Sequence, residues 1–457
     1  MKQLFLFMVF VISLSSIKAQ SLSKEQVIED LTQLREGIER FNPTVEQYNP
    51  RFQNRADSLI SSVSKSSLSN YEAFDLISQL CAFSNEGHFS LGTWEDQVHQ
   101  GIINNEVSYI PLVVKIANSK LYVWLDLSDE QVLKRGAEII SINGLSSSEI
   151  LKKLYQSTPS DGRILTYSDR TIENNFSWMY FLYVDKIPGF EIETMLGSGI
   201  AEKNTIQALT REKHFENYEK FYPERIEKQK ETEVDAFHSL SFSGTSATLT
   251  LPSFDRRRVE KYDVDSKKLY KGIFTELKEK AIQNLIIDLR GNTGGLNEFA
   301  DDIVPFIQKR PSDSPLLKRT ISWEERIRNY RFPKASNVAF EGQIYALVNG
   351  RTYSAGSTLA RYLKEYGDAV FIGEETGTRY EGFSAGSQEY VMLENTQIRI
   401  GIPRYHITFD PSEKQTTSNR GLLPDFLIQP TIEELLEETD LHMKKAKKLI
   451  SEKNSSN

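Results

Sequence analysis

The stretch Asn284 to Leu296, NLIIDLRGNTGGL, decides the fold of this chain. It is a short apolar run, typical of a buried strand, that ends in a glycine-rich turn before a helical pattern starting near Asn297. A strand-like segment, SATLTLPSF at residues 246–254, and a helical pattern at residues 265–282 precede it. Strand, helix and strand in this order predict a parallel sheet covered by helices, which is an α/β domain.

A second stretch of the same kind follows further along the chain. Tyr345 to Ala360, YALVNGRTYSAGSTLA, again joins an apolar run to a helical pattern through small residues. Ser354 stands at the junction, where the positive end of a helix favours an alkoxide-like hydroxyl, although the same position also suits a helix N-cap. The glycine turn can aim backbone N–H groups at a substrate oxygen. Together the motifs predict acyl transfer with Ser354 as the nucleophile.

The two motifs resemble those of the carboxyl-terminal-processing (tail-specific) serine peptidases and the related tricorn core. Those families carry a D-x-R-x-N-x-G-G turn and a later T-x-S-A serine. The resemblance implies a crotonase-like (ββα superhelical) catalytic domain that hydrolyses peptide bonds of polypeptides. It also implies an oxyanion hole made by Gly294 or Gly295 together with the N–H of Ala355. A phosphate-binding turn is the alternative, but neither G-x-G-x-x-G nor a G-K-[ST] ending is present.

At the position of the general base, this sequence differs from the better-known bacterial members of the family. Those carry a Lys in G-x-x-T-x-G-K, whereas residues 373–380 read GEETGTRY and place Arg379 there. Arginine keeps its proton near neutral pH and cannot act as a base. SNEGHFSL at residues 84–91 resembles the D-G-H-[TS]-x-L stretch of the tricorn-type branch, which implies His88 as the base, with a pKa around the unperturbed ~6.5. The other five histidines lack such a motif.

The residue that orients the base is left open by the sequence. Tricorn-type enzymes carry an acid in E-N-x-G-x-x-P-D, and the matching residues 418–425 read SNRGLLPD, with Ser418 where the Glu would stand. Glu413 and Glu375 are the candidate substitutes. Arg290 and Asp288 are expected to brace the glycine turn through charged hydrogen bonds rather than to react.

The N-terminus predicts export. Residues 1–19 combine Lys2, the apolar run LFLFMVFVISL and a small-residue cleavage region, which is typical of a signal peptide, so the mature chain should begin near Gln20 in the periplasm or outside the cell. A single-pass anchor is the alternative, but the run is short for a bilayer, and no integral membrane segment is expected after signal removal. The only cysteine, Cys81, excludes an internal disulfide.

Composition excludes other classes of function. The net charge of −8 and the scattered basic residues argue against a nucleic-acid partner. No His/Cys/Asp cluster has ligand spacing, so neither a metal nor an organic cofactor is expected. A lipase or esterase is disfavoured because Thr352 replaces the first Gly of G-x-S-x-G and because His88 precedes Ser354.

Around the catalytic domain we expect an N-terminal helical region and a PDZ-like β-rich module. Residues 136–154, GAEIISINGLSSSEILKKL, resemble the PDZ segment that reads G-D-x-I-x-x-I-N-G, although any two strands joined by an Asn-Gly turn would look alike. No G-L-G-F loop precedes it. The expected division is signal peptide 1–19, helical region 20–95, PDZ-like module 105–160, connecting region 161–235, catalytic domain 236–435 and charged C-terminal helix or tail 436–457.

The most specific function consistent with these patterns is an exported serine endopeptidase that cleaves polypeptides, with a preference for bonds near carboxyl termini. The alternative is a catalytically silent binding protein that retains the peptidase fold. Arg379 and Ser418, which both depart from the family patterns, keep this alternative open.

Overall fold

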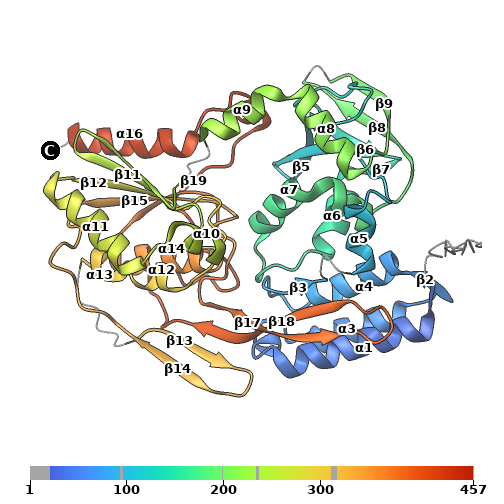
Figure 1. Cartoon of the computed structure of the whole chain (residues 1–457), viewed down its shortest axis with the longest axis horizontal. Helices are drawn as coiled ribbons and strands as arrows, with labels where there is room; N and C mark the ends of the chain where they lie inside the picture. Colours follow the sequence, from blue (N-terminus) through green and yellow to red (C-terminus); the bar gives the residue numbers. More distant parts are fainter. Residues whose placement is uncertain (1–20, 93–95, 198, 233–235, 310–315, 456–457) are drawn as a thin grey trace, which may run out of the picture.

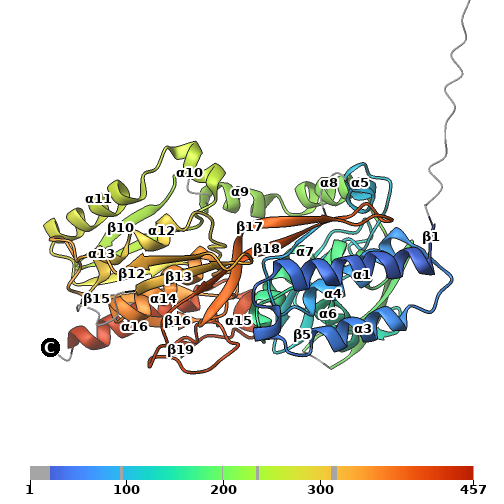
Figure 2. The same ribbon diagram turned by 90° about the horizontal axis from the view of Figure 1, so that it is seen from below.

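The computed structural model describes residues 21–92, 96–197, 199–232, 236–309 and 316–455. The expected signal peptide at residues 1–19 lies outside these ranges. None of the helices within them is long and apolar enough to cross a membrane. The described chain forms an α/β domain, an N-terminal helical region and a small β-rich module, which Figures 1 and 2 show in two views.

A six-stranded sheet forms the centre of the α/β domain. Its strands run in the order β10 (Ser239–Ser243), β11 (Ser246–Thr250), β12 (Asn284–Asp288), β15 (Gln343–Val348), β16 (Val370–Gly373) and β19 (Phe426–Leu427). All neighbours pair in parallel except β10 with β11. The parallel α/β sheet predicted from the apolar runs is therefore confirmed.

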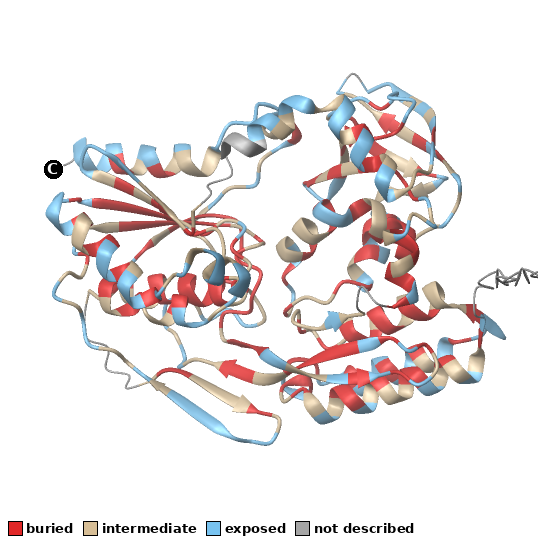
Figure 3. Ribbon diagram, viewed as in Figure 1, coloured by how far each residue is buried: buried red, intermediate tan, exposed pale blue. Residues whose placement is uncertain are grey.

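Both faces of this sheet are covered. Side chains alternate along a strand, so Leu285 and Ile287 pack with the core that holds α11 (Ser266–Glu279) and α14 (Ala355–Gly367). Ile286 faces the other side and packs against α16 (Leu441–Ser455). Because both faces of the sheet are buried, the sequences of β12 and β15 are continuous apolar runs. Figure 3 shows both strands as buried. Short helices complete the domain: α10 (Arg256–Tyr262), α12 (Glu298–Asp301), α13 (Val304–Ile307) and α15 (Ile432–Leu436).

A long hairpin links the α/β domain to the N-terminal region. It consists of β17 (Gly382–Met392) and β18 (Arg399–Thr408), and β18 also pairs with β13 (Leu316–Ser322), which pairs with β14 (Ile327–Arg331). The hairpin reaches in among the N-terminal helices (Figures 1 and 2), where Val391 and Ile400 share one buried core with them. These helices are α1 (Lys24–Phe41), α2 (Val45–Tyr48), α3 (Phe52–Ser62), α4 (Asn70–Ala82) and α5 (Gln97–Ile103), and β1 (Ser21–Ser23) pairs with β2 (Ser67–Ser69) beside them.

The hairpin also fixes the loop that carries His88. Strand β3 (Ser90–Leu91) pairs antiparallel with β18 through Ile400 and Gly401. The loop between α4 and β3 is therefore attached to a sheet of the α/β domain, although it belongs to the N-terminal region by sequence.

The β-rich module extends beyond the predicted residues 105–160. Its sheet contains β4 (Leu112–Ala117), β5 (Lys120–Asp126), β6 (Glu138–Ile142), β7 (Leu145–Ser146), β8 (Gly189–Met195) and β9 (Ala201–Gln207), with α6 (Ser147–Gln156) and α7 (Leu165–Tyr183) against it. Much of the expected connecting region 161–235 thus belongs to the module, because Phe176 and Tyr180 of α7 are buried in its core. Helices α8 (Arg211–Phe221) and α9 (Pro223–Thr232) then lead from it toward the α/β domain (Figure 1).

Candidate active site

The glycine turn and the serine turn lie side by side. Strands β12 and β15 are parallel neighbours, so the turns that follow them emerge at the same edge of the sheet. A Cβ added to Gly294 would lie 2.8 Å from Cβ of Ser354 and 2.6 Å from the backbone nitrogen of Ala355. Gly294 also has a φ of +85°, a conformation that favours glycine. The two sequence motifs therefore form one site, and only a glycine fits at this contact.

Asn292 holds the two turns together. Its side-chain amide donates to the carbonyl of Leu251 at 2.8 Å, its Oδ1 accepts the N–H of Gly294 at 2.8 Å, and its main-chain oxygen accepts the N–H of Tyr353 at 2.9 Å. The residue is fully buried. A role for Asn292 was not predicted from the sequence, although the Asn of the D-x-R-x-N-x-G-G pattern was a signal for one.

Two backbone donors remain available beside Ser354. The N–H of Gly294 is bonded to Asn292, whereas the N–H groups of Gly295 and Ala355 have no acceptor within the described part of the chain. Ala355 is the first residue of α14, where a helix leaves its N–H groups without intrahelical partners. Of the two candidate glycines, Gly295 therefore has the free donor.

Ser354 has a strained backbone. Its φ of 53° and ψ of −124° are rare for a residue other than glycine and cost on the order of 1–3 kcal/mol. The surroundings hold this conformation, because the N–H of Ser354 donates to Oγ1 of Thr378 at 2.7 Å and Oγ1 of Thr352 donates to the carbonyl of Leu289 at 2.9 Å. The hydroxyl of Ser354 makes no capping hydrogen bond to α14. The structure therefore contradicts the N-cap interpretation.

His88 lies against the residue that precedes the serine. Its Nδ1 is 2.8 Å from the hydroxyl of Tyr353, and its main-chain oxygen accepts a hydrogen bond of 3.0 Å from Gln388 on the hairpin. Nε2 is shielded from solvent and has no hydrogen-bond partner among the residues that the structure describes. Burial lowers the pKa of His88 to about 4, although the nearby Glu86 carboxylate opposes this shift. The imidazole is thus neutral at neutral pH, which is the state of a proton acceptor.

Four aromatic rings stack in a column through His88. The ring of Tyr167 on α7 lies 4.4 Å from that of Tyr353, which lies 4.5 Å from the imidazole, and the ring of Phe383 lies 5.4 Å from the imidazole. Interplanar angles between 17° and 24° make all three contacts stacked. A role for Tyr353 was not predicted from the sequence, because Tyr353 occupies the variable position of T-x-S-A.

Arg379 braces the loop before His88. Its guanidinium pairs with the carboxylate of Glu86 at 3.2 Å, and both side chains are completely buried. It also donates to the carbonyl of Asn85. The backbone N–H of Arg379 binds one oxygen of Asp161 at 3.1 Å, and the other oxygen accepts the N–H of Gly87 at 2.6 Å. Arg379 therefore fixes three successive residues of this loop.

The structure contradicts Glu375 as the residue that orients the base. Both of its carboxylate oxygens bind Arg420, at 2.7 and 2.6 Å, and one also accepts the N–H of Gly421. The other candidate, Glu413, is exposed, as is Ser418. The group that contacts Nδ1 of His88 is instead the hydroxyl of Tyr353.

Arg290 stabilises the glycine turn from outside. It binds Asp288 at 2.6 Å and both oxygens of Asp440, just before α16, at 2.7 and 2.8 Å. The bracing role expected for Arg290 and Asp288 is confirmed. Across the described ranges, no three His, Cys, Asp or Glu residues are grouped so that they could hold a metal ion.

Comparison with known proteins gives a family match for the part of the chain that holds the glycine turn and Ser354. Residues 245–428 match the family model described as Peptidase family S41. The solved structure of mature CPAF complexed with lactacystin has a TM-score of 0.66 and 12% sequence identity, covering 93% of this chain and 97% of that one. At this identity the likeness shows the fold alone. No curated protein sequence matches the chain.

Two further solved structures are more distant. The photosystem II D1 C-terminal processing protease has a TM-score of 0.43 at 14% identity, over 92% of this chain and 98% of that one. The tricorn protease has a TM-score of 0.41 at 16% identity, over 94% of this chain and 37% of that one.

Proposed function

Because this chain carries a domain of peptidase family S41, the domain of a serine-type peptidase, we propose that it is an exported endopeptidase with Ser354 as nucleophile and His88 as base. Its substrates are polypeptides, cleaved preferentially near their carboxyl termini. The observation that carries the proposal is the strained backbone of Ser354, whose hydroxyl is left uncapped where the serine turn meets Gly294. Such strain is retained where surrounding contacts impose it, and it clusters at active sites.

The proposed reaction uses Nε2 of His88 and the two free backbone donors. Oγ of Ser354 attacks the scissile carbonyl carbon while Nε2 of His88 accepts the hydroxyl proton. The N–H groups of Gly295 and Ala355 stabilise the oxyanion. The imidazolium then gives its proton to the leaving amine. A water molecule, deprotonated by the same nitrogen, attacks the acyl-enzyme, and that proton passes to Oγ of Ser354 as the acyl–oxygen bond breaks.

Different residues orient the imidazole of His88 and supply the negative charge near it. In the tautomer that this step needs, Nδ1–H of His88 donates to the hydroxyl of Tyr353, which stays neutral because burial raises its pKa well above the ordinary value. The negative charge that favours the imidazolium comes from Glu86, which raises the pKa of His88. In a Ser-His-Asp triad one carboxylate performs both tasks. This division accounts for a site in which Ser418 replaces the acid.

The finer architecture belongs to the same proposal. A crotonase-like arrangement is supported by the parallel strands β11, β12, β15 and β16, which are joined through helices. A PDZ-like module is supported by its antiparallel sheet and by α6, which begins in a capping box at Ser146 directly after the Ile-Asn-Gly turn. Export rests on the sequence of residues 1–19.

A fluorophosphonate probe tests the function. The mature protein is expected to be labelled at Ser354, and Ser354→Ala is expected to abolish labelling without loss of the folded state. Ser357→Ala is the matched control, because Ser357 lies on the same helix and its hydroxyl is already bonded to the carbonyl of Thr352 at 2.6 Å. Full labelling of Ser354→Ala would refute this nucleophile. A wild type that is neither labelled nor active on unfolded polypeptides would favour the silent binding protein.

A further inference from the structure

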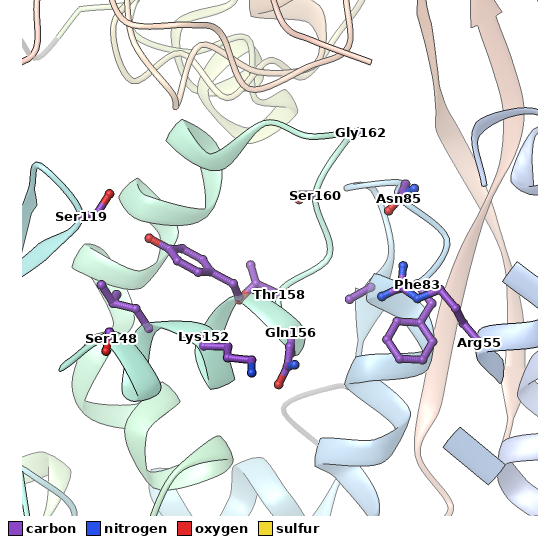
Figure 4. A pocket seen from close by; sticks show the side chains of 13 residues that line it. Arg55, Phe83, Asn85, Ser119, Ser148, Lys152, Gln156, Thr158, Ser160 and Gly162 are labelled. Carbon is purple, nitrogen blue, oxygen red and sulfur yellow. The ribbon is translucent and has the colours of Figure 1, made fainter. Parts of the chain in front are cut away.

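The connection between α6 and α7 of the β-rich module, residues 157–164, reaches the loop that carries the base. The N–H of Gly162 in this connection donates to the carbonyl of Asn85 at 2.9 Å. Figure 4 shows Gly162 and Asn85 on neighbouring segments, among residues that line a cavity. Helix α7 begins directly after the connection, and Oγ1 of Thr166 in its first turn donates to the carbonyl of Glu375 at 2.9 Å. The module therefore contacts both the loop of the base and the segment that follows β16.

Asp161 of this connection has a completely buried side chain, and each of its carboxylate oxygens accepts one backbone N–H. Oδ1 accepts from Gly87 at 2.6 Å, one residue before His88. Oδ2 accepts from Arg379 at 3.1 Å. A single carboxylate thus joins two segments that are far apart in the sequence.

The second of these segments also holds the nucleophile. Thr378 directly precedes Arg379, and its Oγ1 accepts the N–H of Ser354 at 2.7 Å. This hydrogen bond helps to maintain the strained backbone of Ser354. Asp161 therefore lies between the two catalytic residues. One N–H that it binds is next to His88, and the other is next to the residue that holds Ser354.

Close packing at Gly87 transmits movement of this junction to the base. A Cβ added to Gly87 would lie 2.5 Å from the hydroxyl of Tyr353 and 3.1 Å from Oδ1 of Asp161. The backbone of Gly87 is thus enclosed between that hydroxyl and the carboxylate. The same hydroxyl lies 2.8 Å from Nδ1 of His88. A shift of Gly87 away from Asp161 therefore presses on the group that orients the imidazole.

The charge of Asp161 is unfavourable for stability alone. Two buried carboxylates, Glu86 and Asp161, share the positive charge of Arg379. Burial raises the pKa of Glu86 most, and the negative charge of Asp161 raises it further. An amide in place of Asp161 would remove this repulsion, but it has only one acceptor oxygen and could not bind both N–H groups. What the carboxylate adds is a simultaneous hold on both segments.

We propose that Asp161 is a positioning residue that sets the distance between His88 and Ser354, an inference that rests on the proposed peptidase function. It acts on the base through the loop before His88 and on the nucleophile through Thr378. Proton transfer from Oγ of Ser354 to Nε2 of His88 needs the two atoms within hydrogen-bond reach, so loosening of either segment slows the reaction. The β-rich module thereby contributes to the organisation of the active site.

Fluorophosphonate labelling of the full chain tests this with Asp161→Asn. The maximal labelling rate should fall about ten- to a hundredfold, because a small misplacement of reacting groups is enough for such a loss. The probe concentration that gives half of that rate should change by less than about threefold, since Asp161 does not touch the probe. Asp161→Ala, which leaves a space that water can fill, should lose at least as much and serves as the second variant if the amide is not tolerated.

Asp30→Asn is the matched control. Asp30 is also buried, and its two oxygens also each accept one backbone N–H, from Asn395 at 2.9 Å and from Thr396 at 2.7 Å. These contacts join α1 to the turn of the β17–β18 hairpin. The control should lose at least as much stability in urea as Asp161→Asn but should be labelled at the parent rate.

Two readouts separate positioning from stability. The labelling rate of the parent should level off once His88 is neutral, whereas that of Asp161→Asn should keep rising with pH as hydroxide replaces the misplaced base. A purely structural role would lower the folded fraction without changing the shape of this profile. In a His88→Ala background, Asp161→Asn should change the rate by less than about threefold, because the distance to an absent base no longer matters.

Parent-like labelling of Asp161→Asn, an equal loss in Asp30→Asn, an unchanged pH profile, or a full loss that persists in the His88→Ala background would each overturn the inference and leave the peptidase standing. A wild type that the probe never labels would overturn the peptidase and this inference with it.

Discussion

Replacement of Arg379 by Met is expected to lower the free energy of unfolding by about 3–5 kcal/mol at neutral pH. Methionine fills much of the same volume, but it leaves the carboxylate of Glu86, which is fully buried, without the cation that lies 3.2 Å away. It also removes the charge that stacks 3.5 Å from the ring centroid of Tyr48 and the hydrogen bond to the carbonyl of Asn85. The dominant loss is therefore the uncompensated charge of Glu86.

The size of this loss depends on pH. Burial raises the pKa of Glu86, and Arg379 opposes that shift, so the variant should raise it further. A carboxyl group with a raised folded pKa contributes stability below its unfolded value of about 4.3 and loses that contribution as the pH rises through the folded value. The deficit of Arg379→Met should thus be largest near pH 8 and smaller near pH 5.

Urea unfolding followed by tryptophan fluorescence at both pH values measures the effect. The double variant Glu86→Gln/Arg379→Met should recover at least half of the loss, because Gln can still accept from the hydroxyl of Thr44. Arg404→Met is the control, since its pair with Glu389 is partly exposed and should matter by about 1 kcal/mol or less. A loss in Arg379→Met no larger than that of the control, or one that does not change with pH, would refute the reasoning.

Three further outcomes concern the site itself. Tyr353→Phe keeps the ring stack but removes the hydroxyl that contacts Nδ1 of His88, so fluorophosphonate labelling should slow about ten- to a hundredfold. The control Tyr167→Phe should be labelled at the normal rate. Equal labelling rates for the two variants would exclude an orienting role for the hydroxyl of Tyr353. Gly294→Ala should fold, as judged by circular dichroism, but lose labelling, because its Cβ would lie 2.6 Å from the nitrogen of Ala355; normal labelling would show that the turn gives way. The acid limb of the labelling rate should follow the neutral form of His88 and fall closer to pH 4 than to pH 6.5, and a limb at 6.5 would contradict the buried imidazole.

Local sequence patterns were enough to predict the parallel sheet and the meeting of the two turns. Burial on both faces imposes continuous apolar runs on β12 and β15, and parallel neighbours bring their ends to the same edge, so local patterns were sufficient. The bracing of the turn by Arg290 could be predicted in the same way, because Asp288 is only two residues away.

The tertiary structure alone decided what surrounds the serine. His88 and Tyr353 are 265 residues apart, and they meet because β3 pairs with β18 and the hairpin shares a buried core with the N-terminal helices. Helix α7 belongs to the β-rich module rather than to a linker, because its apolar side chains are buried in the core of that module. The hydrophobic pattern of a sequence indicates which side chains are buried, and its glycines indicate tight turns. Neither indicates which distant part of the chain packs against a buried side chain, and it is this long-range packing that places Tyr353, rather than a glutamate, beside His88.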